Sequence, residues 1–148
     1  MVPDAILLVE DSEDDVILTK CALEDAGIVN PVQAVSNADQ AMAYLNGEGV
    51  YRDRTSYPLP CLIFIDLWLP GKSGHELLAW MAEQPALKSI VRVVLTGSEN
   101  PADIKRARES GANGYICKPL TVEQLTKPGR NLQTLLRRPV TRAEVAST

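Results

Sequence analysis

The chain of 148 residues has the size of one ordinary domain, and its apolar fraction of 45% is enough to form one hydrophobic core. Its net charge of −4 argues against a general affinity for nucleic acids, and its apolar runs are far shorter than the roughly 20 residues that span a bilayer. The N-terminus lacks the basic start and long apolar stretch of an export signal, so we expect a cytoplasmic protein that binds neither DNA nor membranes.

Five short β-type runs alternate with five helix-type segments along the chain. The runs are 5–9, 31–35, 61–65, 90–95 and 114–117. The first and third runs are apolar throughout, which is typical of central strands that helices cover on both faces of a parallel sheet. The alternation predicts an α/β fold of the (βα)₅ type, a doubly wound, flavodoxin-like parallel sheet with strand order 2-1-3-4-5.

Capping residues indicate where the helices begin and end. Four pairs place a polar cap three residues before a side chain that is able to reach back: Ser12 with Asp15, Asn37 with Gln40, Ser73 with Glu76, and Thr121 with Gln124. Pro101 after Asn100 fits the first position of a further helix. Gly27 and Gly111 are natural helix ends.

Two segments interrupt this regular order. Residues 46–60 form a connection longer than the usual length of about 2 to 6 residues, and we leave open whether it contacts a partner or is a tolerated insertion. Pro128-Gly129 is expected to break or kink the last helix. We therefore place one domain at 1–136 and a polar C-terminal tail at 137–148.

The cysteines do not indicate a metal site. Cys21, Cys61 and Cys117 form no CxxC pair, and His75 is the only histidine in the sequence. The ligand spacing of zinc sites is therefore absent, and we expect reduced, mostly buried thiols.

Residues of chemical interest stand at the strand ends. The first strand ends in Glu10-Asp11, the third in Asp66 and the fourth in Thr96, and the fifth runs into Lys118. If the first and third strands are neighbours, three carboxylates meet in one pocket, where their repulsion calls for a cation. Oxygen ligands alone favour Mg²⁺. With a lysine and a hydroxyl beside it, such a site suits phosphoryl transfer onto Asp66 as the nucleophile.

Over residues 4–126 the sequence resembles the receiver domains of bacterial response regulators, which act in two-component systems and phosphorelays. The motifs that carry the resemblance are Ile6-Leu7-Leu8-Val9-Glu10-Asp11, Asp66-Leu67-Trp68-Leu69-Pro70 with Gly74, Thr96-Gly97-Ser98, and Tyr115 three residues before Lys118. Each motif alone is a weak signal. Together, in this order and at strand ends, they indicate the family.

The resemblance implies a role for each site residue. Asp66 would carry the aspartyl phosphate, and Lys118 would balance the charge of the phosphoryl group. Mg²⁺ would be bound directly by Asp11 and Asp66, through water by Glu10, and by the main-chain carbonyl of Trp68.

The resemblance also implies a switch. The hydroxyl of Thr96 would move toward the phosphoryl group and vacate space for the ring of Tyr115. Trp68 stands two residues after Asp66, and Ser98 stands two residues after Thr96. In the family, residues at these two positions tune the rate at which the aspartyl phosphate is hydrolysed.

These inferences predict a single-domain response regulator, a phosphoprotein that accepts a phosphoryl group but is not a turnover enzyme. The donor would be a sensor histidine kinase or a histidine phosphotransfer protein. The acidic doublet and the long 46–60 segment resemble regulators that are paired with phytochrome-type kinases. We expect a downstream protein target and leave a homodimer open.

Three other functions fit parts of the sequence. Gly71-Lys72-Ser73 resembles the end of a phosphate-binding loop, but the glycine required five residues earlier is replaced by Asp66. A dehalogenase-type phosphatase would need a second aspartate where Trp68 stands. A receiver-like adaptor that works without phosphorylation remains the alternative.

Overall fold

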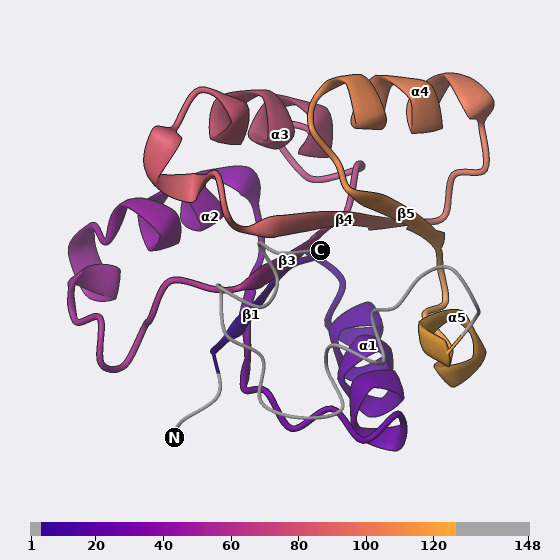
Figure 1. Cartoon of the computed structure of the whole chain (residues 1–148), viewed down its shortest axis with the longest axis horizontal. Coiled ribbons are helices and arrows are strands. Elements are labelled where there is room, and N and C mark those ends of the chain that lie inside the picture. Colours follow the sequence, from indigo (N-terminus) through magenta and orange to yellow (C-terminus); the bar gives the residue numbers. More distant parts are fainter. Residues whose placement is uncertain (1–3, 127–148) are drawn as a thin grey trace.

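A five-stranded parallel sheet with helices on both faces forms the centre of the fold, seen in a computed structural model that describes residues 4–126 (Figure 1). The strands are β1 (Ile6–Val9), β2 (Val32–Val35), β3 (Leu62–Ile65), β4 (Val91–Thr96) and β5 (Gly114–Cys117). The α-helices are α1 (Glu13–Asp25), α2 (Ala38–Asn46), α3 (Gly74–Ala82), α4 (Pro101–Glu109) and α5 (Val122–Thr126). Two short 3₁₀ helices, η1 (Gly49–Arg52) and η2 (Pro85–Leu87), lie in the connections.

The sheet confirms the predicted class and strand order. Its order is β2-β1-β3-β4-β5, and each neighbouring pair is parallel. β1 and β3 are buried along their whole length, as expected of central strands. The point where strand order reverses therefore lies between β1 and β3, and ligands bind at such points in this architecture.

The sheet separates two apolar cores because successive strand residues face opposite sides. Leu7 and Val9 of β1 pack with α2, α3 and α4, whereas Ile6 and Leu8 pack with α1 and α5. Figure 1 shows the same division, with α2, α3 and α4 on one face and α1 and α5 on the other. These two cores hold the strand ends in fixed positions.

The predicted helix starts and stops are confirmed. The side chains of four residues each accept a hydrogen bond from the backbone N–H three residues on: Ser12, Asn37, Ser73 and Thr121. Asn100 caps α4, which begins at Pro101. Gly27 and Gly111 have φ values of 80° and 107°, which a glycine adopts without strain.

Two details differ from the sequence analysis. Asp15 does not reach back to Ser12, because its carboxylate binds Lys118; Glu10 accepts the N–H of Ser12 instead, at 3.1 Å. Of the three cysteines only Cys61 is buried, whereas Cys117 is half-buried and Cys21 is exposed, so the expectation of mostly buried thiols is wrong. Cys21 lies on the solvent side of α1, where a cysteine needs no apolar surroundings.

The 46–60 segment is folded onto α2. The guanidinium of Arg54 donates to the carbonyls of Tyr44 at 2.7 Å, Leu45 at 2.8 Å and Tyr57 at 3.0 Å. Two of these carbonyls belong to the last turn of α2, where backbone acceptors lack partners within the helix. Arg54 thus caps the C-terminal end of α2 and, through the same side chain, holds the 46–60 segment against this helix.

Three tyrosine rings pack beside this cap. The ring centroid of Tyr51 lies 5.1 Å from those of Tyr44 and Tyr57. The hydroxyl of Tyr44 donates to the carbonyl of Pro58 at 2.9 Å, and burial raises the pKa of Tyr44 to about 12. The long connection is therefore an ordered part of the core on this face.

Within residues 4–126, no helix combines the length and the apolar character needed to cross a membrane. The predicted break at Pro128-Gly129 and the boundary between 136 and 137 lie outside the described residues.

Replacing Arg54 with alanine is expected to lower the free energy of unfolding by about 2–3 kcal/mol, because hydrogen bonds from a charged group to half-buried carbonyls are lost. Urea denaturation measures the change. Arg52→Ala, which removes an exposed arginine from η1, serves as the control and should change stability by less than about 0.5 kcal/mol. Equal effects of the two substitutions would show that Arg54 is not the cap.

Candidate functional site

The predicted site residues meet at the carboxyl edge of the sheet. Val9 and Ile65 are paired in register across β1 and β3, so Glu10 and Asp66, which follow them, lie side by side. The N–H of Asp66 donates to the carbonyl of Val9 at 3.1 Å, which fixes the backbone at this point. Topology alone therefore brings the acidic groups together.

Three carboxylates form one cluster. Glu10, Asp11 and Asp66 each present an oxygen, and these oxygens all lie within 4.8 Å of one another. Glu10 and Asp66 are buried, whereas Asp11 is exposed. The set offers only carboxylate oxygens, without nitrogen or sulfur, and thus fits a hard divalent cation such as Mg²⁺.

Lys118 follows β5, the edge strand of the sheet, and its side chain reaches the carboxylate cluster at the same carboxyl edge. Its Nζ lies 2.5 Å from Glu10 Oε2, 2.8 Å from Asp15 Oδ2 and 2.9 Å from Asp66 Oδ2. Its backbone N–H donates to the carbonyl of Thr96 at 2.8 Å, which extends the pairing of β5 with β4 by one bond. The predicted convergence of Asp11, Asp66 and Lys118 is thus present.

Burial and hydrogen bonds shift the pKa values of Glu10 and Lys118. Burial raises the pKa of Glu10, and the hydrogen bond from Lys118 opposes this effect. Burial alone would lower the pKa of Lys118, but its hydrogen bonds to Asp15, Glu10 and Asp66 outweigh burial and raise the pKa. Lys118 therefore stays protonated at neutral pH and contributes a positive charge to the cluster.

Thr96 stands at the end of β4, next to the strand that carries Asp66. Its side chain is fully buried, and its Oγ1 has no hydrogen-bond partner among residues 4–126. An unpaired buried hydroxyl costs about 1–3 kcal/mol, so such groups call for an explanation. Within this part of the chain, the hydroxyl of Thr96 is thus a free donor at the end of β4, the strand next to the one that Asp66 follows.

Tyr115 is joined to the loop that follows Thr96. Its hydroxyl donates to the carbonyl of Ser98 at 2.8 Å, and only 8% of the residue is exposed. The hydroxyl of Ser98 donates in turn to Asp103 of α4 at 2.7 Å. The side chain of Ser98 is therefore held by α4, with no bond to Asp66 among the described residues.

Trp68 lies at the rim of the site. Its backbone N–H donates to Asp66 Oδ1 at 3.1 Å, while 58% of the residue is exposed to solvent. The backbone of Trp68 thus helps to orient the Asp66 carboxylate, and its indole is exposed to solvent.

Asp15 is the site residue that the sequence analysis missed. Its spacing from Ser12 fitted a helix cap, and this local explanation hid the long-range contact with Lys118. A signal was present in the sequence, because Asp15 stands four residues after Asp11, in the first turn of the helix that follows the same strand end.

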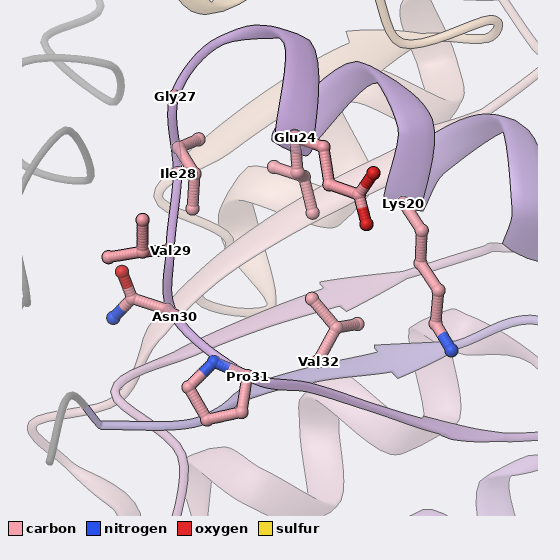
Figure 2. A pocket seen from close by; sticks show the side chains of 9 residues that line it. Lys20, Glu24, Gly27, Ile28, Val29, Asn30, Pro31 and Val32 are labelled. Carbon is pink, nitrogen blue, oxygen red and sulfur yellow. The ribbon is translucent and has the colours of Figure 1, made fainter.

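A separate hollow lies at the opposite edge of the sheet. Lys20, Glu24 and Val32 are among the residues that line it, between the end of α1 and the start of β2 (Figure 2). One lysine and one glutamate do not make a cation site or a nucleophile. The chemistry of the described residues is therefore concentrated at the carboxyl edge.

Comparison with known proteins identifies close relatives. The sequence model of the response regulator receiver domain matches residues 6–128. The response regulator Rcp1 of Synechocystis sp. is 36% identical over 132 residues, which cover 89% of this chain and 88% of Rcp1.

Two solved structures share the fold. The Mn²⁺-bound form of the response regulator Rcp1 has a TM-score of 0.71 and 35% identity, covering 91% of this chain and 90% of that one. The phosphorylated cyanobacterial phytochrome response regulator RcpA has a TM-score of 0.73 and 36% identity, covering 91% and 89% of the two chains.

Gly74, the first residue of α3, is required by close packing behind Asp66. A Cβ at this position would overlap the carbonyl oxygen of Asp66 and come within 2.8 Å of Leu67 Cα. Gly74→Ala is therefore expected to lower the free energy of unfolding by about 1–3 kcal/mol and to weaken Mg²⁺ binding by displacing Asp66.

Urea denaturation and calorimetric titration with Mg²⁺ measure these two effects. Gly97→Ala is the control for stability, since a Cβ there would meet nothing within 4 Å. A Gly74→Ala protein as stable as Gly97→Ala would refute the packing argument.

Proposed function

Since this chain belongs to the response regulator receiver family, we propose that it accepts a phosphoryl group on Asp66 in a Mg²⁺-dependent reaction and signals through contacts with other proteins. One observation carries the proposal: Lys118 Nζ lies 2.9 Å from Asp66 Oδ2, while Asp66 shares a cation-sized cluster of oxygens with Glu10 and Asp11. A nucleophile, a metal-binding set and a fixed positive charge are thereby joined in one place.

The transfer itself needs little covalent chemistry from the protein. A carboxylate oxygen of Asp66 forms a bond to phosphorus, and the bond from phosphorus to the donor breaks, with its electron pair leaving on the donor atom. The Lys118 ammonium balances the negative charge of the phosphoryl oxygens. The product is an acyl phosphate, a mixed anhydride that hydrolyses and so suits a transient signal.

Bound Mg²⁺ would neutralise further charge on the transferred group. In this proposal Asp11 and Asp66 bind it directly and Glu10 binds through water, and the family resemblance adds the main-chain carbonyl of Trp68. Asp66 is the phosphoacceptor in this proposal, and each phosphorylation consumes its free carboxylate until the phosphate is hydrolysed. We therefore do not propose a turnover enzyme.

The switch in our proposal begins at Thr96. Its buried hydroxyl, unpaired within the described part of the chain, would donate to a phosphoryl oxygen on Asp66. The ring of Tyr115 is already buried and bonded to the Ser98 carbonyl, so the unphosphorylated protein needs a second, more exposed rotamer of Tyr115 for this ring to act as a switch. The surface of β4, α4 and β5 would then differ between the two states.

The proposed donor is a sensor histidine kinase or a histidine phosphotransfer protein. The similarity to RcpA, a phytochrome response regulator, supports a phytochrome-type kinase. The proposal also places the protein in the cytoplasm, where such donors meet their receivers, and it includes a protein as the downstream target.

Incubation with Mg²⁺ and acetyl phosphate is expected to add one phosphoryl group, which intact-protein mass spectrometry detects. Asp66→Asn should abolish the added mass, because an amide cannot form the acyl phosphate. Asp14→Asn, an equal charge change on the exposed side of α1, should leave it unchanged. An unmodified wild-type protein would contradict the proposal and support a phosphorylation-independent adaptor.

Trp68→Ala is expected to speed hydrolysis of the phosphorylated protein about threefold to tenfold, because the indole at the rim of the site hinders the approach of water. Loss of phosphate is followed after removal of acetyl phosphate. Val50→Ala, which removes an exposed apolar side chain from η1, provides the matched control. A rate in Trp68→Ala that equals the wild-type rate would show that the indole does not shield the phosphate.

A further inference from the structure

The Lys118 ammonium uses all of its donors on three carboxylates. An ammonium group has three N–H donors and no acceptor. Glu10 follows β1, Asp66 follows β3, and Asp15 belongs to the first turn of α1; all three lie within hydrogen-bond distance of Lys118 Nζ. The position of the ammonium is therefore defined from three different elements.

Two of these partners have a second task. Glu10 and Asp66 belong to the cluster of oxygens that fits a divalent cation, and Asp66 is also the proposed phosphoacceptor. In the proposed function these two carboxylates would therefore serve both Lys118 and the cation, and Asp66 would also carry the phosphoryl group. Asp15 is not a member of the oxygen cluster found in residues 4–126, so its carboxylate serves Lys118.

The fold holds Asp15 firmly in this position. Its backbone N–H donates to the side chain of Ser12 at 3.3 Å, which fixes the start of α1. A carboxylate in the first turn is stabilised by the positive end of the helix dipole. The side chains of Lys118 and Asp15 are only 17% and 36% exposed, so water screens their ion pair less than a surface pair.

We propose that Asp15 is a positioning residue for phosphoryl transfer, which holds the Lys118 ammonium over Asp66 while Glu10 and Asp66 engage the cation and the phosphoryl group. This role rests on the proposed function. Without the Asp15 carboxylate, Lys118 depends for its hydrogen bonds on Glu10 and Asp66, the two carboxylates that also belong to the oxygen cluster proposed to hold the cation.

The test compares Asp15→Asn with Asp14→Asn. Both substitutions remove one negative charge from the first turn of α1, but Asp14 is exposed and has no ion pair in the described structure. Asp15→Glu keeps the charge and serves as the conservative variant. Thermal unfolding of each protein verifies that the fold is retained.

The first readout is the position of the lysine itself. The side-chain ¹⁵N signal of the Lys118 ammonium, assigned by its loss in Lys118→Arg, should be sharp and slowly exchanging in wild type and Asp14→Asn, both with and without Mg²⁺. In Asp15→Asn with Mg²⁺ it should broaden or disappear, because the remaining partners engage the cation.

The second readout separates binding from the transfer step. With acetyl phosphate, Asp15→Asn should lower the maximal phosphorylation rate about tenfold relative to Asp14→Asn, as expected when a charge is no longer held at the transferring group. The Mg²⁺ dissociation constant, measured by calorimetry, should rise about threefold more than in Asp14→Asn. Asp15→Glu should recover most of the rate.

The outcomes distinguish the two proposals. An unchanged Lys118 signal in Asp15→Asn, or a phosphorylation rate equal to that of Asp14→Asn, would overturn the role of Asp15 while leaving the proposed function intact. A wild-type protein that takes no phosphoryl group would overturn the proposed function itself.

Discussion

Repulsion among carboxylates at one edge of the sheet is the constraint on which the site depends. Two like charges about 4 Å apart repel by about 4 kcal/mol at the effective dielectric of a protein surface, so a group of such charges is stable only with cations among them. Lys118 supplies one cation and binds Glu10, Asp15 and Asp66 at once. The remaining negative charge is the physical reason why, in our proposal, this edge of the sheet would bind a divalent metal and, with it, a phosphoryl group.

Much of the fold and most of the site were predictable because they follow from local patterns and general topology. Apolar runs marked the strands, and polar caps marked the helices. Parallel strands bring their carboxyl ends to one edge, so Asp11 and Asp66 had to lie near each other once β1 and β3 were neighbours. No property specific to this chain was needed for that step.

The features that were not predicted depend on contacts between residues far apart in the sequence. Asp15 satisfied a local capping pattern, but a lysine 103 residues away gives its side chain a stronger partner. Similarly, the composition of the 46–60 segment indicated a loop and did not reveal that Arg54 would cap α2. In both cases the sequence is equally consistent with a charged side chain that faces solvent or binds a near neighbour in the chain. The long-range partner becomes evident only once the fold has brought the two segments together.

Lys118 also connects the site to the strands that would report its state. Its side chain binds carboxylates of β1, α1 and β3, while its backbone N–H binds the carbonyl of Thr96 on β4. Tyr115, three residues earlier on β5, binds the loop that follows Thr96. In our proposal, a change of partners at the ammonium would therefore act on the same strand end whose hydroxyl and loop form the switch. Hydrogen bonds thus run from Asp66 through Lys118 to Thr96, and Tyr115 and Ser98 join the loop after Thr96 to α4. In our proposal, phosphorylation of Asp66 would change the β4–α4–β5 surface through these contacts, as a phosphorylation signal requires.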